Sequence, residues 1–141
     1  MKRNVMLSIR GTQNYMDQDP DVIELVTEGT LKKTEEGWKL LYQESSLTGM
    51  EGVTTCFDIT PEKLVLTRTG ALKSRMEFQK GIVHDSLYEM PFGALLLRVC
   101  ATKIACCLDD NGAGTVDLVY TIEIEHSSAG VIDYHLDIRP L

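Results

Sequence analysis

The polar side chains best placed to bind a small molecule lie in the middle of the chain. Glu44 follows Tyr42 by two positions, Arg68 follows Leu66, and Ser74 precedes Met76. Residues two apart on a β-strand share a face, so these polar groups are predicted to point the same way as their apolar neighbours. An inward arginine presents a fork that suits a carboxylate or phosphate. The predicted ligand contacts are Tyr42, Glu44, Arg68, Ser74, His84 and Tyr88.

The same residues allow other interpretations. Glu44 and Arg68 also fit a self-satisfied ion pair, or side chains near strand ends that reach water. His84 and Ser86 share a face, but neighbouring side chains on one strand point in parallel, and no glycine-flanked serine elbow accompanies them. A hydrolase that uses Glu44 or Glu51 with His84 therefore stays a third alternative, behind a binding protein.

Metal and cofactor sites are not predicted. Cys56, Cys100, Cys106 and Cys107 lack metal-ligand spacing, and the adjacent Cys106 and Cys107 would face opposite sides of a strand. Phosphate-loop and dinucleotide patterns are missing as well. We expect no cofactor and no bound metal.

Period-two alternation runs through nearly every segment and predicts the strands that carry these residues. Val5, Leu7 and Ile9 form one apolar face, and the sets around Trp38, Phe57 and Tyr120 repeat the pattern between turns. Parity changes between Val99 and Ile104, which predicts a β-bulge near residues 101–103; a helix there is the competing interpretation. About ten half-buried strands result.

Composition limits the classes of partner. The chain has 141 residues, 43% of them hydrophobic, and a net charge of -7 with scattered basic residues, so a nucleic-acid partner is disfavoured. The apolar start is interrupted by Ser8 and Arg10, and the window from Phe92 to Leu108 by Arg98 and Lys103. We therefore expect neither a signal peptide nor a membrane span, and a cytoplasmic location.

These strands lack an amphipathic helix to cover them, so they must bury their apolar faces against one another. A sandwich and a barrel both achieve this, but a long meander of hairpins closes most simply as an up-and-down barrel. The predicted fold is a single all-β domain over residues 1–141, an antiparallel β-barrel of about ten strands.

Four runs of residues resemble the YwiB-like family, a bacterial domain family of unknown function. They are Ile9-Arg10-Gly11-Thr12-Gln13, Glu24-Leu25-Val26-Thr27-Glu28-Gly29, Thr48-Gly49-Met50-Glu51-Gly52 and Ser86-Leu87-Tyr88-Glu89-Met90-Pro91-Phe92-Gly93. The resemblance spans essentially the whole chain and departs from the family motif only mildly, at Met90. It implies a calycin-like, lipocalin-resembling barrel and no assigned activity.

Two functional hypotheses follow. The leading one is a protein that binds a small amphipathic or anionic ligand inside the barrel, as a monomer or a homodimer. The alternative is an interaction or structural module, because aromatic residues such as Trp38, Phe57 and Phe78 would fill a narrow barrel and leave no room for a ligand.

Overall fold

The structure is a computed structural model that describes residues 2–15, 19–44 and 51–141. It contains ten strands: β1 (Lys2–Tyr15), β2 (Asp21–Lys33), β3 (Trp38–Gln43), β4 (Val53–Ile59), β5 (Leu64–Gly70), β6 (Lys73–Phe78), β7 (Val83–Met90), β8 (Gly93–Leu108), β9 (Gly114–Ile124) and β10 (Ser127–Pro140). Each strand pairs with its neighbours in sequence, and β10 pairs with β1 to close the barrel. The predicted all-β barrel of about ten strands is confirmed.

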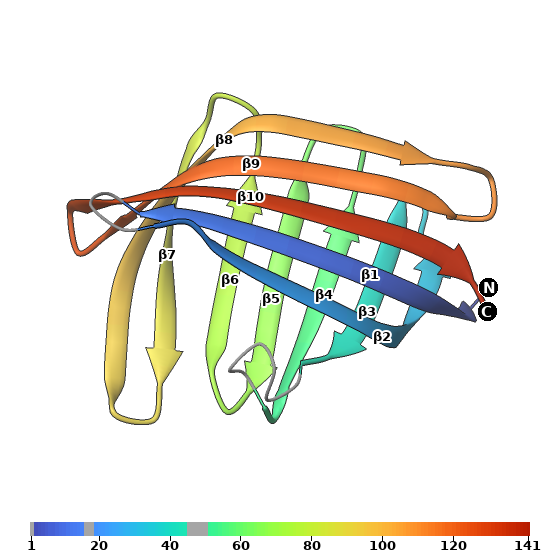
Figure 1. Ribbon diagram of the computed structural model, residues 1–141, viewed down its shortest axis with the longest axis horizontal. Coiled ribbons are helices and arrows are strands. Elements are labelled where there is room, and N and C mark those ends of the chain that lie inside the picture. Colours follow the sequence, from blue (N-terminus) through green and yellow to red (C-terminus); the bar gives the residue numbers. More distant parts are fainter. Residues whose placement is uncertain (1, 16–18, 45–50) are drawn as a thin grey trace.

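The barrel wall consists of two layers of strands that cross each other (Figure 1). One layer contains β3 to β7, and the other contains β1, β2, β9 and β10. β8 belongs to both layers, since its first half pairs with β7 up to Cys100 and it pairs with β9 from Leu97 to Leu108. A closed wall of this kind encloses one shared interior.

The turn of β8 from one layer to the other coincides with an extra residue. The β8–β9 register shifts between Ala101 and Lys103, which confirms the bulge predicted from the parity change, and the competing helix is wrong. The bulge keeps Val99 and Ile104 on the same side of the sheet although one is odd and the other even. Bulged strands bend and twist more strongly, so the extra residue positions the corner of the barrel.

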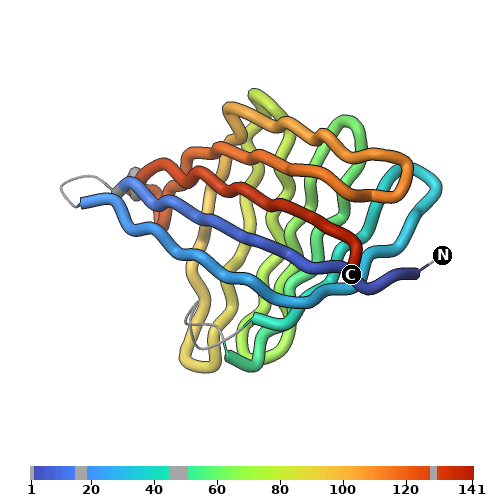
Figure 2. The backbone as a smooth tube through the Cα atoms, turned by 45° about the vertical axis from the view of Figure 1, so that its right-hand side comes forward, coloured from blue at the N-terminus to red at the C-terminus, as the bar shows by residue number. Residues whose placement is uncertain are grey.

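The two ends of the barrel differ in how far they are filled. At the end that holds both termini (Figure 2), called here the packed end, the interior is solid with side chains such as Leu7, Leu31, Leu64 and Phe78, which expose 0% of their surface. The opposite end, at which β7 meets β8 and β9 meets β10, is called the cavity end. The packed end stabilises the barrel and leaves the cavity end available for a site.

Two details differ from the sequence interpretation or lie beyond it. Ile82 has the parity of His84 and Tyr88, which the sequence predicts to point inward, but it lies before β7 and is 47% exposed. Thr48, Gly49 and Met50 lie outside the described residues. Nowhere in the described ranges is there a helix with the length and apolar character that a membrane span requires.

Candidate ligand-binding site

A cavity of about 410 Å³ occupies the cavity end of the barrel. Most apolar side chains of its wall come from β1, β2, β8, β9 and β10; these residues are Ile9, Ile23, Leu25, Leu95, Leu97, Ile122, Ile124 and Ile132. Polar groups lie among them and on the strands across the interior, namely Gln13, Glu44, Arg68, Tyr88, Tyr120 and Tyr134. The volume lies within the range of small-molecule sites.

A polar row crosses five neighbouring strands beneath this cavity. Tyr42 lies opposite Thr55, Thr55 opposite Arg68, Arg68 opposite Ser74, and Ser74 opposite Tyr88. Directly opposed residues on antiparallel strands have side chains on the same face. Strand pairing therefore brings together residues that the sequence separates by more than forty positions.

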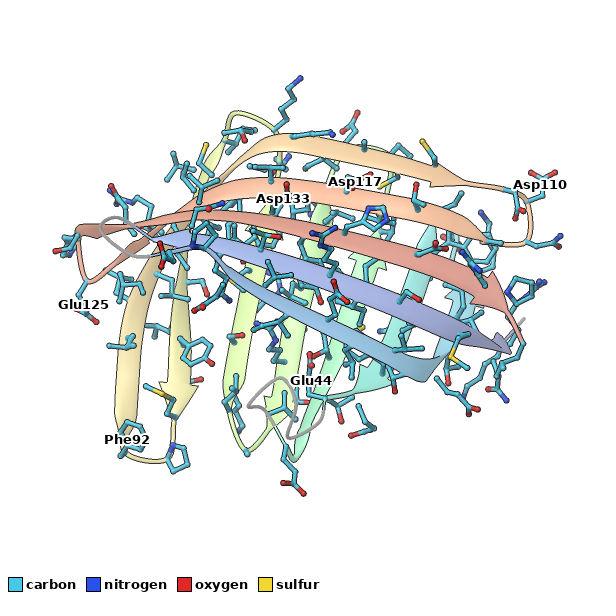
Figure 3. The ribbon with its side chains drawn as sticks, viewed as in Figure 1. Glu44, Phe92, Asp110, Asp117, Glu125 and Asp133 are labelled. Carbon is cyan, nitrogen blue, oxygen red and sulfur yellow. The ribbon has the colours of Figure 1, made fainter. Side chains whose placement is uncertain are left out.

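Glu44 and Arg68 form the charged part of the site. Arg68 Nε lies 4.0 Å from Glu44 Oε2, and the two side chains are 12% and 2% exposed. Thr55 Oγ1 donates a hydrogen bond of 2.5 Å to the same carboxylate oxygen. Figure 3 shows Glu44 at the edge of the barrel where the β3 and β4 ends lie. The separation of Glu44 and Arg68 is at the limit of an ion pair.

Three buried polar atoms in this region have no hydrogen-bond partner within the described part of the chain: Arg68 Nε, Ser74 Oγ and Ser86 Oγ. Arg68 and Ser74 are directly opposed on β5 and β6, so two of these atoms belong to neighbouring side chains. Buried polar groups without partners are uncommon, because each loses its hydration without compensation. Such atoms mark a place where a ligand group or water would supply the missing bonds.

Two tyrosines connect the layers of the barrel. The hydroxyls of Tyr42 on β3 and Tyr134 on β10 share a hydrogen bond of 2.8 Å. Burial is the main cause that raises the pKa of Tyr134 to about 12, and burial together with Tyr134 and Glu44 raises the pKa of Tyr42 above its ordinary value. Both phenols are therefore neutral hydrogen-bonding groups at physiological pH.

His84 lies apart from this row. Its Nε2 is 2.9 Å from Gln79 Oε1, and its Nδ1 is 3.6 Å from Glu77 Oε2. The cavity wall does not include it within the described residues. The imidazole bonds to Gln79 rather than to Ser86, so the geometry lends no support to a serine–histidine pair.

The six predicted contacts thus occupy three kinds of position. Glu44, Arg68 and Tyr88 line the cavity; Tyr42 and Ser74 lie in the polar row; His84 contacts Gln79 and Glu77 instead. No group of three or more His, Cys, Asp or Glu side chains in the described ranges is arranged to hold a metal ion.

Sequence reasoning missed four polar residues of the site: Gln13, Thr55, Tyr120 and Tyr134. Each carried the correct parity signal, since Gln13 continues the face of Ile9 and the other three lie between inward apolar residues of β4, β9 and β10. The apolar neighbours along these strands favoured a core position over a site. Only the closed topology shows that Tyr134 reaches Tyr42 from the other layer.

Comparisons with known proteins agree with this architecture. The crystal structure of the ywiB protein from Bacillus subtilis superposes with a TM-score of 0.82 at 19% sequence identity, covering 99% of this chain and 93% of that chain. At this identity the likeness shows the fold. No curated protein matches. The family model for the domain of unknown function DUF1934 matches residues 7–138. The chain therefore belongs to the DUF1934 family, as its YwiB-like motifs indicated.

Proposed function

We propose that this protein binds a small amphipathic anion in the cavity of its barrel. The observation that carries the proposal is the cavity of about 410 Å³, whose mainly apolar wall includes a small number of polar groups, with Arg68 as a cation among them. Ligand sites are typically apolar pockets with a few convergent polar groups that fix orientation. A molecule with an apolar body and a polar head matches both kinds of group in the wall.

The polar groups of the wall favour an anionic head. Arg68 is the cation of the site, and its Nε and the opposed Ser74 Oγ are buried donors without a hydrogen-bond partner among the described residues. A carboxylate or similar head accepts bonds from both and takes advantage of the arginine fork. The apolar body then lies against residues such as Leu25, Leu97 and Ile122.

Glu44 sets the strength of this interaction. Its carboxylate lies 4.0 Å from Arg68 Nε and competes with a bound anion for the same positive charge. Removal of Arg68 alone would leave Glu44 buried without its cation, which is strongly destabilising. A clear test of binding therefore changes both charges together.

The test measures binding of anilinonaphthalene sulfonate, an amphipathic anion that fluoresces in apolar surroundings, with decanoate as a competitor. We expect Glu44→Gln to bind the dye about tenfold more tightly, because like-charge repulsion at the site is lost. The double variant Glu44→Gln/Arg68→Met should bind the dye at least tenfold more weakly than Glu44→Gln, because the anion then has no cation to pair with. Arg75→Met, which removes an exposed arginine on the neighbouring strand, is the matched control and should bind like the wild type.

Circular dichroism of each variant establishes that the barrel is folded before binding is compared. Equal dye affinity in wild type, Glu44→Gln and the folded double variant would contradict the proposal. So would native mass spectrometry that finds the protein free of small molecules after gentle purification and indifferent to added decanoate.

A further inference from the structure

One strand of the closed barrel has an edge without a partner strand. β8 pairs with β9 from Leu97 to Leu108, but β7 pairs with β8 only as far as Cys100, and a single parallel bridge joins Ala101 to Lys80. Beyond it, residues 102–108 have no second partner strand among the described residues. In Figure 1 this half of β8 forms the margin of its layer. An open edge of this length is a template for another strand.

The edge carries little of the protection that exposed edges usually have. It contains one charged residue, Lys103, and no proline. Lys103, Cys106 and Cys107 are exposed, whereas Ile104 and Leu108 are half-buried. An edge of this composition accepts an additional strand, which would cover the apolar residues.

The sequence of the edge is complementary to its own antiparallel copy. If a two-fold axis passes through Cys106, Lys103 of one copy lies opposite Asp109 of the second, and Ile104 lies opposite Leu108. Opposed residues share a face, so both ends of the ladder carry an opposite-charge pair and the apolar residues meet each other. A shift of the axis to Ala105 would place Lys103 opposite Cys107 and lose the charge pairs.

Asp109 remains able to accept a lysine in this arrangement. Its two hydrogen bonds, from the backbone N–H groups of Asn111 and Ala113, go to Oδ1 and hold the β8–β9 turn. Oδ2 of the same carboxylate therefore remains for the partner. Asp110, at the tip of the same turn in Figure 3, adds a second negative charge nearby.

We propose that two copies of this chain associate through antiparallel pairing of residues 103–109, the end of β8 and the first residue after it, with Cys106 on the two-fold axis. The pairing joins the β8–β9–β10 layers of both copies into one continuous sheet. It leaves the cavity end of each barrel free, because the lining residues of β8, Leu95 and Leu97, lie on its other half. The association is independent of ligand binding.

The register is tested by oxidative cross-linking. The oxidant diamide converts two thiols that meet across the axis into a disulfide and is itself reduced to the hydrazine. Partial desolvation of the thiol by its neighbours, with Cys107 and Asp117 nearby, raises the pKa of Cys106, so the reaction is run at mildly alkaline pH. We expect a covalent dimer from the wild type and from Cys107→Ser, and none from Cys106→Ser. Cross-linking that depends on Cys107 alone would overturn the proposed register.

The charge pairs are tested by sedimentation equilibrium without oxidant. Asp109→Asn keeps the side-chain oxygen that holds the turn but removes the charge, and we expect dimer dissociation constants about fivefold weaker. Lys103→Glu places like charges together and should weaken the dimer further. Lys32→Glu, an exposed substitution of the same kind on β2, is the matched control and should leave the dimer unchanged. A wild type that remains monomeric at about millimolar concentration would overturn the proposal.

Discussion

Tyr42 and Tyr134 show how single residues link the stability of the barrel to its site. Their hydroxyls meet across the interior, and Tyr134 also lines the cavity. Burial disfavours the charged phenolate, so the pKa of both residues lies above that of a tyrosine in the unfolded chain. The folded state therefore retains these protons at a pH at which the unfolded state releases them.

The sign of the resulting pH dependence follows from linkage. The stabilisation is complete below the unfolded pKa of 10.0 and is lost as pH rises toward about 12, the pKa of Tyr134. We expect the free energy of unfolding of the wild type to fall by about 2 kcal/mol across this window. Urea unfolding at several pH values should show a clearly smaller fall for Tyr42→Phe/Tyr134→Phe. Equal slopes for the two proteins would show that the phenols do not carry the effect.

Individual strands illustrate what could and could not be predicted from sequence. Alternation identified the strands, and the change of parity after Val99 located the bulge. In a half-buried strand, each residue type shows whether its side chain faces the interior or the solvent. Alternation carries no information on which strand lies across the interior. Thr55 and Tyr134 were therefore missed as site residues, and the contact of His84 with Gln79 and Glu77 could not be foreseen.

The turn between β8 and β9 shows a second feature that parity does not reveal. Gly112 has a φ of 81°, and a Cβ atom there would lie 2.3 Å from Leu31 Cδ2 and 3.1 Å from the Trp38 ring. The turn thus packs closely on the packed end of the barrel. Gly81 has a similar φ of 78°, but a Cβ atom there would meet nothing within 4 Å.

This contrast gives a matched pair of substitutions. Gly81→Ala should cost about 1 kcal/mol of stability, because only the backbone conformation is strained. Gly112→Ala combines the same strain with overpacking against Leu31 and Trp38, so we expect a loss of about 3 kcal/mol. Urea denaturation measures both values. Equal losses for the two variants would show that Leu31 and Trp38 shift to accommodate the added Cβ atom without loss of stability.

At the scale of the whole molecule, the barrel combines the two alternatives for its interior, one filled with side chains and one with room for a ligand. One end is filled, as the structural alternative required, and the other holds the cavity of about 410 Å³ that the binding hypothesis required. Apolar side chains alone could not show this division, since residues such as Ile9 and Leu7 alternate identically along β1. The volume left inside depends on how the two layers cross, which is a property of the assembled wall.

The pairing of β6 with β7 is the place where the barrel wall is expected to open most readily. The two strands share only two opposed residue pairs, Lys73 with Glu89 and Ser74 with Tyr88, and one isolated bridge joins Gln79 to Ile82 between them, whereas every other joint has five or more pairs. A closed barrel opens most readily between the two strands that have the fewest paired residues to separate. We therefore expect a molecule bound in the cavity to exchange with solvent through the wall at this joint. A disulfide staple, Lys73→Cys/Glu89→Cys, should slow release of the dye in stopped-flow measurements, and its reduction should restore the original rate. An unchanged release rate in the stapled protein would place the exit elsewhere.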